Sequence, residues 1–574
     1  MTSHMQNMLL IETWLNKIEL ADSIELRNSL QTDISSVEDA FSQSLAFGTG
    51  GLRGLMGIGP NRMNIYTVAQ ATQGLSDYLL SNFDNPGVAV CRDSRNMGKE
   101  FVEVVTGVLT SNGIRVKVFP RVEPTPALSF AVRTLRCSAG INITASHNPA
   151  AYNGYKVYGS DGCQITPQAA RKIQKAINDS DIFEDVQCLT FDEAVQTGLV
   201  EWIDDEVLEN YISGIVDYDA SVKEIAGELN LVYTPLNGVG LECVTEVFSQ
   251  IGIEDYQVVS EQAMPDGNFP TCPSPNPEIW EALELGLKLC KKTQPDLLLA
   301  TDPDADRVGV AIPHDGDYTI LTGNEVGILL LDWLCKMLVQ SGRSVEKRVV
   351  VSTIVSSALA DALAMKYGFE LRRTLTGFKY IGEQIGLLEL EGELDRFLFG
   401  FEESCGYLAG TQVRDKDGVM ASMLICQMTR WYRAQGQSLH EVLDAIYHEF
   451  GFYRNSLVSV SCAGAQGMEE LADTISELRA NPPSEIAGLK VIQLVDYASG
   501  LEMPILNAMD TADLQRLEPS NVLEFRLERE NKIIIRPSGT EPKAKAYLFT
   551  KADAPAEADA LLCKLRQSAV EMLT

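Results

Sequence analysis

The fold class of the first part of the chain is decided by residues 88–143, which read VAVCRDSRNMGKEFVEVVTGVLTSNGIRVKVFPRVEPTPALSFAVRTLRCSAGINI. Short apolar runs at 88–90, 116–119 and 141–143 alternate with longer amphipathic runs at 101–109 and 127–135. Apolar strands separated by helical stretches are typical of βαβ construction. These residues therefore predict parallel strands connected by helices.

The same alternation returns twice, and then the pattern changes. A second series contains apolar runs at 231–233, 256–259 and 297–300, and a third contains 349–351 and a long helical stretch at 418–431. Beyond residue 452, strand-like 522–527 and 532–535 are joined by a turn at 528–531, which is typical of an α+β domain. We predict an α/β protein with four domains: 1–205 (α/β, with an N-terminal helical extension), 206–314 (α/β), 315–450 (α/β) and 451–574 (α+β).

Composition narrows the class of protein. The 574 residues, 45% hydrophobic and 22% charged, are ordinary for several folded domains and exclude a single small module, wholesale disorder and collagen-like repeats. Lys and Arg number 47 against 79 Asp and Glu, a net charge of −32. A chain this acidic repels phosphate backbones and anionic lipid, so we expect neither nucleic acid nor a membrane as a partner. An anionic ligand would need a locally positive pocket.

Targeting signals and cysteine spacing indicate a compartment. Residues 1–8 contain no Lys or Arg, and Glu12 interrupts the first apolar run, so a secretory signal is not expected. The twelve cysteines are scattered without a Cys-x-x-Cys pair, unlike a disulfide framework or a zinc module. We predict a reduced, cytoplasmic protein.

A candidate nucleophile follows the apolar run 141–143. The hexapeptide Thr144-Ala145-Ser146-His147-Asn148-Pro149 would lie in a loop at the carboxyl end of a parallel strand, where open α/β sheets carry reacting groups. Ser146 is the candidate. The alternative is an ordinary turn, because Ser, Asn and Pro all favour turns.

A candidate metal site follows the apolar run 297–300. In Asp302-Pro303-Asp304-Ala305-Asp306-Arg307, alternate spacing puts three carboxylates on one side of an extended segment, a set of hard oxygen ligands suited to Mg²⁺ or Ca²⁺. The segment does not match an EF-hand calcium loop, which has Gly at its sixth position and Glu at its twelfth, because Arg307 and Pro313 stand there. A solvated acidic turn is the alternative, and Arg307 could offset charge or hold a phosphate.

A candidate phosphate clamp follows the strand-like 532–535. Arg536 can bind phosphate with two hydrogen bonds, while the hydroxyls of Ser538 and Thr540 and the backbone around Gly539 could form an anion nest. A Pro/Gly turn is the alternative. Weaker signals are the Gly-rich loop at 47–54, Gly377-Phe378-Lys379, the segment 400–404 and Val413-Arg414-Asp415-Lys416-Asp417-Gly418.

Taken together and in this order, these motifs resemble the α-D-phosphohexomutase superfamily over about residues 45 to 550. The form Gly-Phe-Glu-Glu-Ser-Cys-Gly-Tyr at 400–407 is most similar to the branch that contains phosphoglucomutases, phosphopentomutases and glucose-1,6-bisphosphate synthases. The resemblance implies four domains around a central cleft. It also implies that Ser146 is phosphorylated and that Asp302, Asp304 and Asp306, with a phosphoserine oxygen, hold Mg²⁺.

The resemblance also implies roles for the remaining residues. Arg536, Ser538, Gly539 and Thr540 would bind the distal phosphate, assisted by Lys416 and Arg414. The sugar would be contacted by Glu402, Ser404, Thr376, Gly377 and Lys379, with Arg307 beside the metal loop. Lys156, His147 and Arg53 would lie near the reacting oxygen, with Lys156 as the first candidate for the base, which would require a lowered pKa.

The activity that the resemblance implies is reversible phosphoryl transfer between glucose 1-phosphate and glucose 6-phosphate, with glucose 1,6-bisphosphate as intermediate. Cys405-Gly406-Tyr407 replaces the His-containing sugar loop of phosphomannomutases and phosphoglucosamine mutases, which favours glucose. Phosphopentomutase, phosphomannomutase and glucose-1,6-bisphosphate synthase activities are the close alternatives. A non-catalytic protein that binds sugar phosphates is the alternative from another class.

Overall fold

The computed structural model describes residues 3–48, 50–218, 225, 227–461, 464–499, 501–504, 517–537 and 543–574. The chain forms two compact units, each made of two segments: Met1–Val326 with Phe378–Gly436, and Gly327–Gly377 with Gln437–Thr574. Within the described ranges, no helix combines the length and the apolar character that crossing a bilayer demands.

The first sheet confirms the βαβ prediction for residues 88–143. Its strands lie in the order β1 (Gly51–Leu55), β5 (Tyr152–Gly159), β4 (Ala139–Ile143), β2 (Gly87–Arg92), β3 (Arg115–Val118) and β6 (Val200–Trp202). The four from β4 to β6 are parallel, whereas β5 and β1 are antiparallel to their neighbours. β4 is buried along its whole length, and its one polar side chain, Asn142, donates to Thr125 Oγ1 (2.7 Å).

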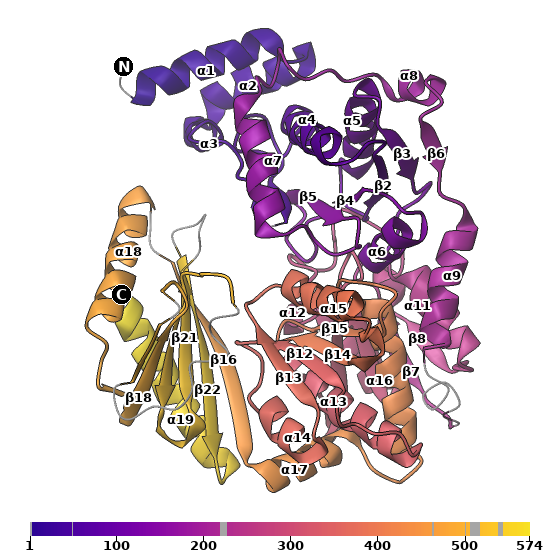
Figure 1. The fold of residues 1–574 in the computed structure, drawn as a ribbon, viewed down its shortest axis with the longest axis vertical. Helices are drawn as coiled ribbons and strands as arrows, with labels where there is room; N and C mark the ends of the chain where they lie inside the picture. Colours follow the sequence, from indigo (N-terminus) through magenta and orange to yellow (C-terminus); the bar gives the residue numbers. More distant parts are fainter. Residues whose placement is uncertain are drawn as a thin grey trace. The chain divides into compact units, whose positions relative to one another are not determined.

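Helices cover both faces of this sheet. α4 (Ile65–Asn82), α5 (Gly98–Ser111) and α7 (Pro167–Asp179) pack on one face, and α6 (Thr125–Thr134) lies on the other (Figure 1). Val88 and Val90 belong to the core under α4, α5 and α7. Because side chains alternate along a strand, the intervening Ala89 and Cys91 point to the opposite face. The short α8 (Phe191–Gln196) packs beside α5.

The N-terminal extension consists of α1 (Ser3–Lys17), α2 (Leu20–Thr32) and α3 (Ile34–Ala40). Its helices share a small core around Trp14, which is 1% exposed. The indole meets Phe41, Tyr66 and Phe183 edge to face, with ring centroids 5.3 to 5.7 Å apart. Since Tyr66 and Phe183 belong to the first α/β domain, these helices are packed onto that domain.

The second sheet of the same unit has the order β11 (Asp317–Leu321), β10 (Val308–His314), β9 (Leu297–Thr301), β7 (Leu231–Thr234), β8 (Tyr256–Val258). β9, β7 and β8 are parallel, and β10 returns antiparallel to β9, so the Asp302–Arg307 loop is a tight connection between two central strands. The associated helices are α9 (Asp205–Val216), α11 (Leu241–Gln250), η1 (Ser260–Gln262) and α12 (Trp280–Thr293).

The last segment of the first unit contains α15 (Phe378–Glu391), η2 (Leu394–Arg396), the antiparallel pair β14 (Phe397–Glu402) and β15 (Gly406–Ala409), and α16 (Gly418–Arg433). α16 begins where the Asp417 carboxylate accepts a hydrogen bond from the Met420 amide (2.9 Å). Helix α13 (Gly323–Gln340) contains the boundary between the two units, which falls between Val326 and Gly327.

The second unit contains an antiparallel sheet. Its strand order is β16 (Phe452–Ser461), β22 (Lys543–Ala552), β21 (Lys532–Pro537), β20 (Leu523–Leu527), β18 (Leu489–Asp496) and β17 (Glu485–Ile486), and β19 (Leu501–Pro504) also pairs with β18. The predicted turn between β20 and β21 is η4 (Glu528–Glu530). β16 pairs with β22 from Phe452↔Ala552 to Ser461↔Lys543. The other elements are the parallel pair β12 (Val349–Thr353) and β13 (Glu370–Thr374), and helices α14 (Leu359–Tyr367), α17 (Leu439–Phe450), α18 (Gly464–Ala480) and α19 (Pro555–Leu573).

The packing of Trp14 predicts the stability of the N-terminal helices. Trp14→Ala removes the centre of their small core, and large-to-small substitutions of this kind cost about 3 to 5 kcal/mol. We expect hydrogen exchange in α1 to α3 to accelerate, while α4 and α5 keep their protection. Leu9→Ala, on the same helix but 58% exposed, is the control and should change little. Equal exchange rates in both variants would contradict this packing.

Candidate active site

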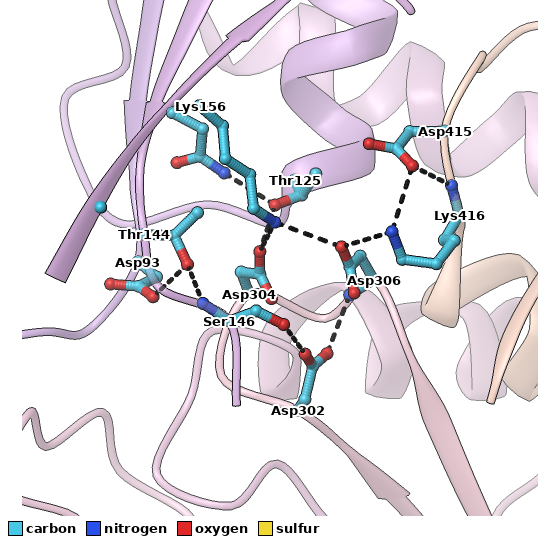
Figure 2. A network of polar contacts seen from close by, with 12 residues as sticks. Asp93, Thr125, Thr144, Ser146, Lys156, Asp302, Asp304, Asp306, Asp415 and Lys416 are labelled. Atoms are coloured by element: carbon cyan, nitrogen blue, oxygen red, sulfur yellow. Dashed lines mark hydrogen bonds and ion pairs between the residues drawn. The ribbon is translucent and has the colours of Figure 1, made fainter. Parts of the chain in front are cut away.

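Ser146 lies in the loop after β4, as expected from the sequence, and its side chain faces the Asp302 loop (Figure 2). Its hydroxyl donates to Asp302 Oδ2 over 2.6 Å. The residue is 2% exposed and has a left-handed backbone with φ of 52°. A non-glycine residue adopts this conformation only where its surroundings impose it, and such strain is concentrated at functional sites.

The three carboxylates of Asp302, Asp304 and Asp306 converge in the β9–β10 loop. All are buried, and each offers an oxygen within 4.8 Å of the others. Asp302 Oδ1 accepts hydrogen bonds from the backbone amides of Asp306 (3.1 Å) and Arg307 (3.0 Å), which fixes the turn. Oδ1 of Asp304 and Oδ1 of Asp306 are buried and have no hydrogen-bond partner among the described residues. Buried oxygens without donors, on three adjacent carboxylates, suit a hard divalent cation.

Two lysines flank the carboxylates. Lys156 Nζ, from β5, lies 2.7 Å from Asp304 Oδ2 and 3.3 Å from Asp306 Oδ2. Lys416 Nζ approaches the same Asp306 oxygen at 3.1 Å and also contacts Asp415 (3.3 Å), so Asp306 Oδ2 lies between two ammonium groups (Figure 2). Ion pairs this deeply buried persist only when the charges are well matched.

Burial and charge shift the pKa values of these groups in opposite directions. Burial, with the neighbouring carboxylates of Asp304 and Asp306, raises the pKa of Asp302 well above its ordinary value. Burial also acts to raise the pKa of Asp304, but the charge and hydrogen bond of Lys156 outweigh it and hold that pKa below its usual range. Of these two carboxyls, Asp302 is therefore the one that is protonated more readily as the pH falls.

The pKa of Lys156 is shifted in the opposite direction to the one predicted. A base role was expected to require a lowered pKa, but although burial acts in that direction, the carboxylates of Asp304 and Asp306 raise the pKa of Lys156 above its ordinary value. The same balance, with burial opposed by Asp306 and Asp415, raises the pKa of Lys416. Both side chains are therefore cations in this arrangement.

His147 and Arg53 are the other residues predicted to lie near the reacting oxygen. His147 Nδ1 lies 3.2 Å from Ser146 Oγ, and burial together with Arg307 and Arg53 lowers the pKa of His147 far below its ordinary value, so the imidazole is neutral. Arg53 donates to Asn148 Oδ1 (3.1 Å), on the same loop as Ser146. Arg307 pairs with Glu278 at 3.0 Å.

The predicted sugar contacts of the first unit have different surroundings. Glu402 is buried at the end of β14, and its charge acts on both Arg307 and Lys416. Ser404 is half-buried in the β14–β15 connection. Lys379 is buried on α15, with its ammonium over the Tyr380 ring. The Arg414 guanidinium donates to Glu389 of α15 (2.9 Å) and to the Thr411 carbonyl, contacts that the sequence did not suggest, and its role in binding the substrate stays a prediction.

The remaining predicted residues belong to the second unit or are not described. Thr376 and Gly377 are half-buried at the end of its first segment, and Gly377 has φ of 127°, where glycine is favoured. Arg536 is exposed near the end of β21. Ser538, Gly539 and Thr540 lie outside the described residues, so their role as a phosphate clamp stays a prediction.

Sequence reasoning missed several residues that hold the site together. Thr125 Oγ1 donates to Asp304 Oδ2 (2.8 Å), and Asp415 Oδ2 accepts from Tyr158 (2.9 Å). Asp93 accepts from Thr144 (2.6 Å), whose hydroxyl accepts from the Ser146 amide (2.8 Å). Asp93 was predictable, because it follows β2, the parallel neighbour of β4, and carboxyl ends of parallel strands share one edge.

Comparison with known proteins identifies the family of the chain. Three models described as phosphoglucomutase/phosphomannomutase alpha/beta/alpha domains I, II and III match residues 44–182, 209–316 and 322–450. The chain therefore belongs to the phosphoglucomutase/phosphomannomutase family. It is 36% identical over 517 residues to a phosphoglucomutase of Staphylococcus haemolyticus, covering 90% of this chain and 92% of that protein.

Solved structures support the same fold. A putative phosphomannomutase from Thermus thermophilus is 23% identical with a TM-score of 0.67, covering 92% of this chain and 99% of that one. The open form of parafusin from Paramecium is 17% identical with the same TM-score, covering 92% and 96%. The family and the α/β fold class expected from the sequence are confirmed. Members of this family need a metal ion, which the buried Asp triad is able to bind.

The triad predicts metal binding with release of a proton. Because burial and its neighbours raise the pKa of Asp302, protons compete with a cation for this carboxylate, so affinity for Mg²⁺ should weaken as pH falls through that pKa. Calorimetric titration in two buffers of different ionisation enthalpy should give different apparent heats. Equal heats and a pH-independent affinity would contradict the prediction.

Two matched variants test which carboxylate matters. Asp304→Asn removes the ionised ligand and should weaken Mg²⁺ binding by about tenfold or more. Asp315→Asn, at a side chain that is 90% exposed, should leave the affinity unchanged. Equal Mg²⁺ affinity in the two variants, measured by the same calorimetric titration, would exclude Asp304 as a ligand.

Proposed function

We propose that this chain is a phosphoglucomutase that interconverts glucose 1-phosphate and glucose 6-phosphate through a phosphoserine at Ser146. The observation that carries the proposal is the position of the Ser146 hydroxyl, 2.6 Å from a buried cluster of three carboxylates flanked by two lysines. Support comes from the curated relatives, which are named phosphoglucomutases and are matched over most of their length. The protein is then an enzyme, an intramolecular phosphotransferase of the isomerase class, in carbohydrate metabolism.

Bond changes at Ser146 define the reaction. The bond from phosphorus to Ser146 Oγ breaks while a bond to the free sugar hydroxyl forms, giving glucose 1,6-bisphosphate. Transfer of the other phosphate back to Ser146 Oγ regenerates the phosphoserine and releases the isomer. A magnesium ion held by Asp302, Asp304 and Asp306 would offset charge on the transferring phosphoryl group.

The chain's own cations and neutral groups perform the remaining tasks. In the first transfer the proton of the attacking sugar hydroxyl ends on Ser146 Oγ, and in the second transfer it passes from Ser146 Oγ to the sugar oxygen that leaves phosphorus. Lys156, whose pKa is raised, is proposed to relay that proton as a cation rather than to act as a free base. The neutral His147, 3.2 Å from Ser146 Oγ, adds no charge beside the phosphoserine. Glu402 and Ser404 are proposed to bind ring hydroxyls, with Lys379, Arg307, Thr376 and Gly377. Arg536, Ser538, Gly539 and Thr540 are proposed for the distal phosphate, with Lys416.

The compartment belongs to the same proposal. The described cysteines are free thiols, and most are buried. Disulfides are rare where thiols are kept reduced, which supports a cytoplasmic enzyme acting on phosphosugars.

Ser146→Ala tests the phosphoserine. Without the phosphoryl acceptor, turnover of glucose 1-phosphate should fall by at least about 10⁴-fold, in line with removal of a nucleophile in other enzymes. Intact-mass analysis after incubation with glucose 1,6-bisphosphate should show one phosphate on the wild type and none on the variant. Ser138→Ala is the control, at the residue that immediately precedes β4, and this variant should keep both the turnover and the bound phosphate of the wild type. Full turnover by Ser146→Ala would refute the proposal.

Glucose preference is a separate prediction. With Mg²⁺ and catalytic glucose 1,6-bisphosphate, kcat/KM for glucose 1-phosphate should exceed that for ribose 1-phosphate and mannose 1-phosphate by about tenfold or more. A preference for ribose would identify a phosphopentomutase with the same phosphoserine chemistry. Faster production of bisphosphate from 1,3-bisphosphoglycerate than isomerisation would identify a synthase.

A further inference from the structure

The loop that carries Ser146 is gathered around one buried guanidinium. Arg95 is 2% exposed and belongs to the loop after β2. Its Nη1 donates to the carbonyls of Pro149 (2.9 Å) and Tyr152 (2.8 Å), and its Nη2 donates to the carbonyls of Ser146 (2.6 Å) and Asn148. One planar cation therefore fixes four carbonyl oxygens of the segment 146–152. Lysine has no equivalent fork of donors.

The same arginine is linked to the backbone of Ser146 through Asp93. The Arg95 amide donates to Asp93 Oδ1 (2.9 Å), and the Arg95 Nε lies 3.4 Å from Asp93 Oδ2. Asp93 Oδ2 accepts from Thr144 Oγ1, which in turn accepts from the Ser146 amide. Both the amide and the carbonyl of Ser146 are thus tied to Arg95, one through Asp93 and Thr144 and the other directly. These two groups flank the Cα of Ser146, where φ is 52°.

A segment of the second α/β domain also contacts the arginine. The Phe269 ring lies 5.0 Å from Arg95 Cζ, and Ser274 donates to the carbonyl of His147 (2.9 Å). Gly267 packs so closely that a Cβ there would lie 2.4 Å from the Asn96 amide nitrogen. The segment 267–274 therefore contacts both Arg95 and the loop that carries Ser146.

We propose that Arg95, enclosed by Phe269, is a positioning residue that keeps the Ser146 oxygen directed at the Asp triad during phosphoryl transfer. The inference rests on the proposed function. A phosphoryl group on Ser146 would bring further negative charge beside three carboxylates, and the strained backbone could relieve both strain and repulsion by rotating out of the left-handed region. The four carbonyl bonds to Arg95 oppose that rotation.

Arg95→Lys is the central variant, since it keeps the charge and removes the fork. Misplacing a reacting atom by about 1 Å can cost about 100-fold in rate, so we expect kcat for glucose 1-phosphate to fall by about that factor while KM stays within about threefold. Hydrogen exchange at the amides of residues 146–148 and 150–152 should accelerate. Arg115→Lys, on an exposed arginine of β3, is the matched control and should change none of these.

Phe269→Leu keeps the proposal testable if Arg95→Lys does not fold. Loss of the ring over the guanidinium should lower kcat by about tenfold with KM preserved, and accelerate exchange in the same loop. An unchanged kcat, or a rise in KM alone, in a folded variant would overturn the positioning role. If the wild type turned over no phosphosugar, the proposed function would fail. The exchange measurement would then still decide whether Arg95 holds the loop, and unaltered exchange in both variants would refute that.

Discussion

Mutual repulsion among Asp302, Asp304 and Asp306 is the constraint around which the first unit is built. Three carboxylates within five residues, all buried, repel one another unless positive charge is supplied, and burial with this repulsion raises the pKa of Asp302. The chain supplies it from Lys156 on β5 and Lys416 just before α16, and both ammonium groups reach one oxygen of Asp306. Since these lysines are far from the triad along the chain, the charge balance forms only when three parts of the chain have assembled.

Much of this arrangement could be predicted from the sequence because its signals are local. Apolar runs identified β2 and β9, and the two isoleucines of Ile141-Asn142-Ile143 identified β4, since strands buried on both faces are mostly apolar. The position of Ser146 followed from the rule that carboxyl ends of parallel strands carry the reacting groups. The Asp triad followed from spacing alone, because its ligands lie within one short loop.

The parts that could not be predicted depend on strand register and on packing between distant segments. Lys156 faces Asp304 because β5 runs antiparallel to β4 with Lys156 opposite Asn142, and nothing in its own sequence reveals that register. Its raised pKa follows from the same contact. Arg414 lies in a motif of charged residues, yet its guanidinium packs against Glu389. Arg95 looks like an ordinary loop arginine until the carbonyls of the Ser146 loop are brought around it.

The pairing of β16 with β22 also has a consequence for how the protein is made. These strands are joined from Phe452↔Ala552 to Ser461↔Lys543, so a strand that leaves the ribosome early waits for one synthesised much later. Until then the hydrogen-bonding edge of β16 that β22 will cover is open, and unpaired edges of this kind promote association between nascent chains. The first sheet closes over comparable separations, since β1 pairs with β5 from Gly51↔Lys156 to Leu55↔Tyr152. The final sheet is nevertheless completed later than the sheet that carries Ser146, because β22 follows every other described strand along the chain, so its open edge is the last that the growing chain has to cover.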